Sequence, residues 1–229
     1  MANKILEPSL TDLRDRILML GGAAESAISR AMRALVERDP ILAQEVIDGD
    51  DVVDRLELEI DQLCIDVIAL KTPAARDLRF VLMSAKIAPI LERMADLATN
   101  IARRSLSLLD EPQLKPYIDL PRMSEIALHM LGGALEAYAN TDSQKAREVI
   151  LEDNEIDNLF GQVFRELFTY MAEDPKTIKR VTQLLFIAKH LERIGDQVTN
   201  ICEMVVYVKE ARVIKHEHAL GGPIPETTH

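Results

Sequence analysis

Two stretches of this chain repeat one arrangement of polar residues, one hundred positions apart. Residues 91–100 read LERMADLATN and residues 191–200 read LERIGDQVTN. A helix turns about 100° per residue, so side chains four positions apart lie on the same face, one turn apart. Each stretch therefore predicts a row of oxygen ligands along one helix face. The residues of these rows are Glu92, Asp96 and Asn100, and Glu192, Asp196 and Asn200.

A second acidic row precedes each of these. Asp50 and Asp54 lie one turn apart in the first half of the chain, and Asp153 and Asp157 do so in the second. Stacked like charges destabilise a helix by roughly 0.2–0.5 kcal/mol per pair, and bound cations would relieve that repulsion. Carboxylate and amide oxygens suit Mg²⁺, Ca²⁺, Mn²⁺ and iron. The simpler alternative is an acidic face that meets only water, and the spacing alone leaves that alternative open.

The apolar periodicity and the helix-start signals predict six helices and no strand. Asp39-Pro40, Thr72-Pro73 and Asp174-Pro175 each place an N-cap residue before a proline, which is typical of a helix start. No stretch shows the sustained alternation of apolar and polar residues that marks a strand. The helices are expected at 9–38, 41–71, 74–109, 122–140, 143–173 and 175–212.

The last three helices repeat the first three. MLGGA occurs at 19–23 and at 130–134, and DPILAQEVIDGDDVVD at 39–54 is echoed by DSQKAREVILEDNEID at 142–157. Glycine inside a helix costs about 1 kcal/mol relative to alanine, so the paired glycines predict close helix packing. Short loops make neighbouring helices antiparallel. We therefore predict an all-α fold of two pseudo-symmetric three-helix bundles.

The composition argues against several classes of protein. A net charge of −11 disfavours nucleic-acid binding, which needs clustered Lys and Arg. No apolar run is long enough to cross a membrane, the N-terminus lacks a secretory segment, and the two cysteines form no CxxC pair. We therefore expect a cytoplasmic protein without membrane insertion. No metalloprotease, serine-hydrolase or cysteine-nucleophile motif is present, which favours a protein that is not an enzyme.

LERMADLATNIARR at 91–104 and HLERIGDQVTNICE at 190–203 resemble the paired signatures of the PhoU family, the accessory regulators of bacterial high-affinity phosphate uptake. The resemblance continues through TPAARDLRFVL at 72–82 and through residues 164–196, and it covers roughly residues 10–210. One departure is Met94-Ala95 in the first signature, where Ile-Gly is usual. The resemblance implies two helical repeats, and the boundaries that we expect are 1–110, a linker at 111–121, 122–212 and a flexible tail at 213–229.

The resemblance also implies metal-binding Glu(Asp)-x-x-x-Asp motifs occupied by iron, zinc, manganese or magnesium. It implies a homodimer that restrains the phosphate regulon when phosphate is plentiful. The expected partners are the ATPase subunit of the phosphate ABC transporter and the phosphate sensor histidine kinase. Two alternatives remain, a surface di-metal hydrolase and a helical scaffold with solvated acidic faces. The predicted metal ligands are Asp50, Asp54, Glu92, Asp96, Asn100, Asp153, Asp157, Glu192, Asp196 and Asn200.

Overall fold

The computed structural model describes residues 3–214, and within them every regular element is a helix. This confirms the all-α prediction. No helix in that range is long and apolar enough to span a membrane. The tail predicted at 213–229 lies, beyond residue 214, outside the described residues. The elements are α1 (Asn3–Glu37), α2 (Pro40–Asp48), α3 (Asp50–Lys71), α4 (Ala75–Ser107), α5 (Asp119–Asn140), α6 (Ser143–Glu173), the short 3₁₀ helix η1 (Pro175–Thr177) and α7 (Ile178–Glu210).

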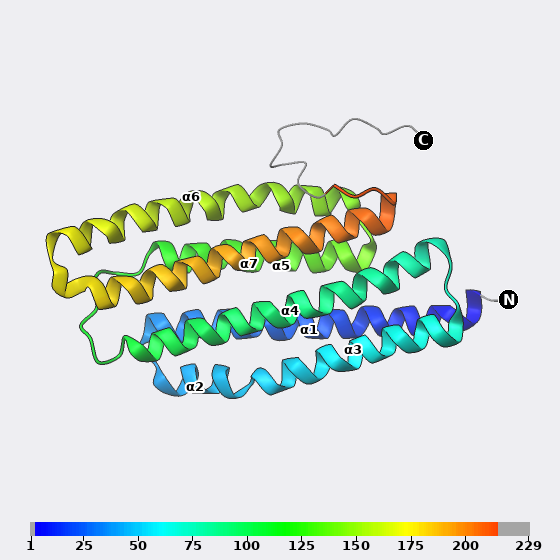
Figure 1. The fold of residues 1–229 in the computed structure, drawn as a ribbon, viewed down its shortest axis with the longest axis horizontal. Helices are drawn as coiled ribbons and strands as arrows, with labels where there is room; N and C mark the ends of the chain where they lie inside the picture. Colours follow the sequence, from blue (N-terminus) through cyan, green and yellow to red (C-terminus); the bar gives the residue numbers. More distant parts are fainter. Residues whose placement is uncertain (1–2, 215–229) are drawn as a thin grey trace.

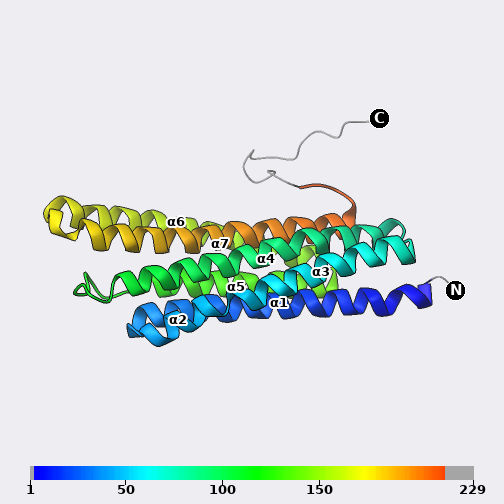
Figure 2. The ribbon, with the colours of Figure 1, turned by 60° about the horizontal axis from the view of Figure 1, so that its bottom comes forward.

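The helices form two three-helix units that share one core. The first unit consists of α1, α2 with α3, and α4, and the second consists of α5, α6 and α7 (Figure 1). The units join where α4 packs along α7 and α1 packs along α5. Figure 1 shows α3 and α6 at opposite edges of an elongated molecule, and Figure 2 shows α6 running alongside α7; α3 and α6 do not contact each other. Each edge helix packs against a neighbour, α3 against α4 and α6 against α7. The line along which the two helices of such a pair meet is here called a groove.

Aliphatic side chains fix the rotation of α4 and α7 about their axes. Leu91 and Met94 of α4 are fully buried, and so are Leu191 and Ile194 of α7. These residues recur at three- and four-residue spacing, which is the pattern of a helix with one apolar face. Burial of this face places the acidic rows beside the core, in the grooves shared with α3 and α6.

Capping side chains begin α2, which leads into α3, and α6. The Asp39 carboxylate accepts hydrogen bonds from the backbone N–H groups of Ile41 and Leu42 at the start of α2. Asp142 does the same at the start of α6. The cap predicted at Thr72 is wrong, because Thr72 adopts a left-handed conformation (φ 45°) that ends α3, and α4 begins only at Ala75.

The single helix predicted at 41–71 is interrupted at Gly49, which separates α2 from α3. Glycine is a poor helix former, and the Gly49 N–H still bonds to the carbonyl of Glu45 while the chain turns into α3. The repeat places Glu152 at the matching position of α6, and α6 continues without a break. The interruption makes Asp50 the first residue of α3.

The glycine pairs mark close helix contacts, as predicted, but only one glycine of each pair is needed. A Cβ on Gly21 would lie 2.6 Å from Leu135 of α5, and a Cβ on Gly133 would lie 2.8 Å from Val149 of α6. A Cβ on Gly22 would meet nothing within 4 Å.

We expect Gly22→Ala to stabilise the protein by about 0.5–1 kcal/mol, because it removes the helix penalty of glycine without a clash. A thermal melt should show a rise in Tm of roughly 1–4 °C. Gly21→Ala is the comparison, and it should be the less stable of the two variants. Equal stability of both variants would mean that the α1–α5 approach does not need a glycine.

Candidate functional site

The first acidic cluster lies in the groove between α3 and α4. Asp50 and Glu92 are half-buried, whereas Asp54 and Asp96 are exposed. Burial, followed by the charges of Asp96 and Asp54, raises the pKa of Asp50. Burial and the same two carboxylates also raise the pKa of Glu92. Four predicted ligands therefore come together from two helices, close enough for their charges to act on one another.

The second cluster occupies the matching groove between α6 and α7. Burial raises the pKa of Asp153 to about 7, helped by the charges of Asp157, Asp196 and Glu192. Burial and neighbouring carboxylates also raise the pKa values of Asp157 and Asp196. These four predicted ligands also come together. The sequence placed the rows on an exposed face, but Asp153 and Glu192 are half-buried because the grooves enclose them.

Two carboxylate oxygens of the second cluster have no partner. Oδ1 of Asp153 and Oε2 of Glu192 are buried and accept no hydrogen bond. A buried oxygen without a donor costs about 1–3 kcal/mol, more when it is charged, so it usually signals water or an ion. The other oxygen of Glu192 is 2.6 Å from the ammonium group of Lys189. Lys189 therefore neutralises this cluster only in part.

Gly195 sets the distance between the helices of the second cluster. A Cβ at this position would lie 2.6 Å from Oδ1 of Asp153 and 3.0 Å from Cδ1 of Ile156. Glycine thus lets the α6 carboxylate approach the backbone of α7. The first repeat has Ala95 at the matching position, so the α3–α4 groove accommodates the methyl group that the second excludes.

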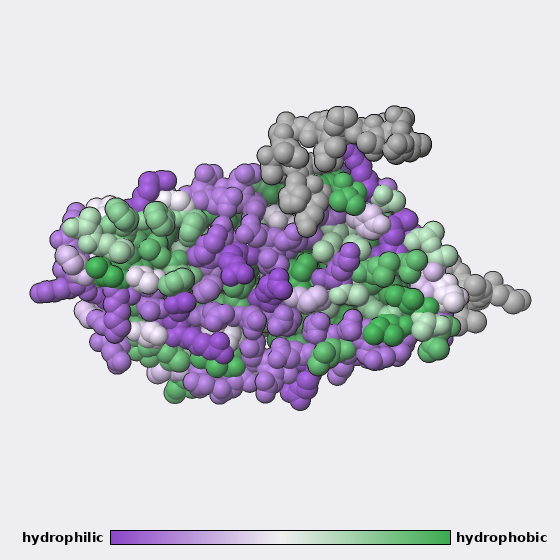
Figure 3. Space-filling view, in the orientation of Figure 1, coloured by the Kyte–Doolittle hydropathy of each residue, from purple (hydrophilic) through white to green (hydrophobic). Residues whose placement is uncertain are grey.

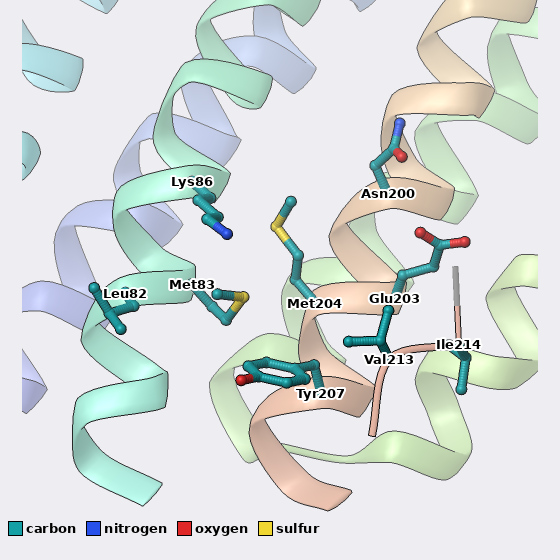
Figure 4. A pocket seen from close by; sticks show the side chains of 9 residues that line it. All are labelled: Leu82, Met83, Lys86, Asn200, Glu203, Met204, Tyr207, Val213 and Ile214. Atoms are coloured by element: carbon teal, nitrogen blue, oxygen red, sulfur yellow. The ribbon is translucent and has the colours of Figure 1, made fainter. Parts of the chain in front are cut away.

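The two predicted asparagine ligands make other contacts. The amide of Asn200 donates a hydrogen bond to the backbone carbonyl of Asp196. Its side chain lines a hollow of about 450 Å³ between α4 and α7 (Figure 4). The amide oxygen of Asn100 accepts a hydrogen bond from Arg103 at 3.4 Å. Neither asparagine is held against its carboxylate cluster by a contact of its own.

Three residues outside the predicted set also belong to the clusters. Glu57 of α3 adds a carboxylate to the first cluster, where it helps to raise the pKa of Glu92. The buried hydroxyl of Thr99 donates to Oδ1 of Asp50 at 3.4 Å. Lys189 pairs with Glu192. The sequence places Glu57 in the same acidic row as Asp50 and Asp54, although Glu57 is not among the predicted ligands, and Thr99 belongs to the repeated motif, so the sequence held a signal for both.

The side chains of the two clusters do not form a complete metal site in the described part of the chain. Among residues 3–214, no group of three or more His, Cys, Asp and Glu side chains is placed so that it could hold a metal ion as it stands. The donor chemistry nevertheless fits a hard cation, and the unpartnered oxygens of Asp153 and Glu192 give that fit a structural basis. Water or rotamer changes would have to complete the coordination.

The α4–α7 contact differs at its two ends. Arg104 of α4 stacks over the ring of Phe186, 4.0 Å from its centroid, and bonds to Gln183 and to Nε2 of His190. Met204 stands at the position of the repeat that matches Arg104 and lines the hollow described above. One end of the contact is thus filled by a guanidinium group, and the other is left open (Figure 4).

His190 makes this contact sensitive to acid. Burial, followed by the charges of Arg104 and Arg193, lowers its pKa to about 4. Because the folded-state pKa lies below the unfolded value of about 6.5, the stabilising contribution of the neutral ring is complete above pH 6.5 and is lost as the pH falls through 4. We expect His190→Gln to raise the Tm at pH 4 relative to the Tm at pH 6.5, compared with the same difference in the wild-type chain. The exposed His129→Gln is the control, and an equal effect of both changes would contradict the assignment.

The fold and the clusters define a class of all-α proteins in which two pseudo-symmetric repeats each carry carboxylates from two helices in one groove. The PhoU domain model matches residues 17–105 and 120–205, one match in each repeat. This chain therefore belongs to the PhoU family.

Relatives and solved structures agree with that assignment. The chain is 41% identical, over 91% of its length and 95% of the relative, to the phosphate-specific transport system accessory protein PhoU homolog of Aquifex aeolicus. It is 40% identical to the homolog of Zymomonas mobilis over 98% of its length and 91% of the relative. The crystal structure of PhoU from Pseudomonas aeruginosa superposes with a TM-score of 0.86 at 35% identity, covering 90% of this chain and 99% of that one.

Proposed function

We propose that this chain is a cytoplasmic, non-enzymatic regulator that restrains a phosphate transport system and its phosphate-responsive signal. Relatives of similar length carry the name of transport-system accessory protein. The observation that carries the proposal furthest is the pair of carboxylate clusters, one in each repeat. Within the described residues the first cluster opens into a surface hollow of about 400 Å³ formed by Asp54, Glu57, Leu58 and Glu92, which suits binding better than enclosed catalysis.

Each cluster would hold a cation such as iron, zinc, manganese or magnesium. Asp50, Asp54, Glu92 and Asp96 would supply the oxygens of the first site. Asp153, Asp157, Glu192 and Asp196 would supply those of the second, with the unpartnered oxygens as its first donors. A bound cation would supply the positive charge that offsets the repulsion among these carboxylates. Its presence or absence would change the charge of the face that a partner meets.

The partners that we propose are the ATPase subunit of the phosphate ABC transporter and the phosphate sensor histidine kinase. The chain has a net charge of −11, and each cluster includes carboxylates of an edge helix, α3 or α6. Acidic surfaces of this kind favour association with basic protein surfaces. A homodimer belongs to the same proposal.

The metal part can be tested by elemental analysis and titration calorimetry on protein purified without chelator. We expect Asp153→Asn with Glu192→Gln to reduce binding of Mn²⁺ or Zn²⁺ by at least tenfold. Asp66→Asn with Glu125→Gln, which removes two carboxylates outside the clusters, is the matched control. Unchanged binding in the cluster variant would place the ion elsewhere.

The regulatory part can be tested in a strain that lacks this gene, with a phosphate-starvation reporter measured in phosphate-rich medium. We expect the wild-type chain to repress the reporter and the cluster variant to repress it less. Failure of the wild-type chain to repress would overturn the proposed function. Full repression by the cluster variant would remove the second acidic cluster from that function.

A further inference from the structure

Three phenylalanines follow one another along the outer part of α6. Phe164 is 49% exposed and Phe168 is 59% exposed, whereas Phe160 is half-buried. The ring centroids of successive residues are 6.5 Å apart, with the first pair of rings tilted and the second pair stacked, so the three rings form a continuous row, the aromatic ridge. Figure 3 shows a hydrophobic patch over this end of α6 and α7, next to a hydrophilic central area. Exposed apolar patches rimmed by polar residues commonly mark interaction sites.

The aromatic ridge continues an acidic row of the second cluster. At about 100° per residue, Asp153, Asp157, Phe160, Phe164 and Phe168 fall within about 80° of one another around the axis of α6. One helix face thus changes from acidic to aromatic along its length. The matching face of α3 carries Asp50, Asp54, Glu57, Asp61 and Ile65, and so it lacks the aromatic half.

The fold does not require these rings at the surface. The buried positions of this part of α6 are Leu159, Val163 and Leu167, which already form its core-facing stripe. Burial of a phenylalanine side chain is worth about 1.5–3 kcal/mol, and about half of that gain is not realised for Phe164 and Phe168. The face is therefore suited to a partner that covers it.

We propose that this face of α6 binds a helix of a partner protein whose apolar side chains cover the aromatic ridge and whose Lys or Arg side chains meet Asp153, Asp157 and Glu192. The inference rests on the proposed function, because it names the surface through which the transporter subunit or the kinase is bound. The charge of the second cluster indicates which kind of partner fits this face. The cluster holds four carboxyl groups, and Lys189 forms an ion pair with only one of them, Glu192, so a basic helix is attracted. A second copy of this chain and an anionic membrane would both bring like charge.

The test measures binding of the purified ATPase subunit and of the kinase cytoplasmic region from the same genome, by interferometry in buffer with chelator. We expect Phe164→Ser with Phe168→Ser to weaken binding at least tenfold. Ile65→Ser with Leu70→Ser on α3, where the two side chains are 52% and 76% exposed, is the matched control and should stay within twofold. If the double phenylalanine variant loses its thermal transition, Phe168→Gln alone replaces it.

A designed helical peptide tests the docking face independently of the proposed function. One half of the peptide carries leucines spaced by three and four residues, and the other half carries arginines. The docking face is supported if the wild-type chain binds the peptide, if the phenylalanine variant does not, and if a peptide with glutamate in place of arginine does not bind. This outcome supports the docking face even if neither protein partner binds. If a protein partner binds the phenylalanine variant as tightly as the wild-type chain, the inference is overturned and the proposed function stands. Failure to bind proteins and peptide alike overturns both.

Two further measurements test the alternative occupants of this face, a second copy of this chain and an anionic membrane. Sedimentation velocity that shows a wild-type dimer and a monomeric phenylalanine variant would assign the ridge to a second copy of this chain. Cosedimentation with phosphatidylglycerol vesicles that depends on the two rings would assign it to a membrane. Either result overturns the inference.

Discussion

Gly195→Val is expected to lower the free energy of unfolding by about 2–3 kcal/mol, which corresponds to a fall in Tm of roughly 4–12 °C for a chain of this size. The first atom of the new side chain would lie 2.6 Å from Oδ1 of Asp153 and 3.0 Å from Ile156. Ile156 is fully buried, so the clash can be relieved only if α6 moves away from α7. A thermal or denaturant melt measures the loss.

The same substitution should weaken cation binding at the second cluster, because Asp153 is displaced from Glu192. Gly161→Val is the matched control, since a Cβ there would meet only the mobile end of Arg165 at 3.4 Å. We expect Gly161→Val to lower the free energy of unfolding by less than half as much as Gly195→Val does. A Gly195→Val protein as stable as Gly161→Val would show that the α6–α7 spacing tolerates a side chain and that Gly195 does not set it.

In the metal-free protein, the carboxylate clusters are expected to contribute less to stability as the pH rises from about 4 to 8, which is opposite in sign to the contribution of His190. Asp153 has a folded-state pKa of about 7, raised by burial and by three neighbouring carboxylates. The folded state therefore holds a proton that the unfolded state releases near pH 4, so the stabilisation is complete below that pH and is lost as the pH passes 7. The raised pKa values of Asp50, Glu92 and Asp196 act in the same direction.

Thermal melts in chelator at pH 5.5 and pH 8 measure this dependence. Asp153→Asn should reduce the difference in Tm, whereas Glu125→Gln, on an exposed face of α5, should leave it unchanged. Added Mn²⁺ should raise the Tm most at pH 8, by about 2.7 kcal/mol in stability at one hundred times the dissociation constant. An Asp153→Asn protein with the wild-type pH dependence would assign the proton to another group.

The ends of several helices and the repeat follow from local sequence. Asp39 and Asp142 cap α2 and α6 through bonds to backbone groups two and three residues away, so a short stretch of sequence determines them. The break at Gly49 was missed because one glycine inside an acidic, helix-like stretch rarely interrupts a helix. Thr72 was misassigned because a Thr-Pro pair suits a helix end as well as a helix start.

The sequence by itself determined the helical class, the twofold repeat and the alignment of Glu92 with Asp96 and of Glu192 with Asp196, because each depends on helix periodicity. Only the tertiary structure decided which oxygens are buried without a partner, because that depends on how closely α6 approaches α7 at Gly195. It also separated the exposed rings of Phe164 and Phe168 from the buried Leu167, because exposure is set by the neighbours that a helix face meets.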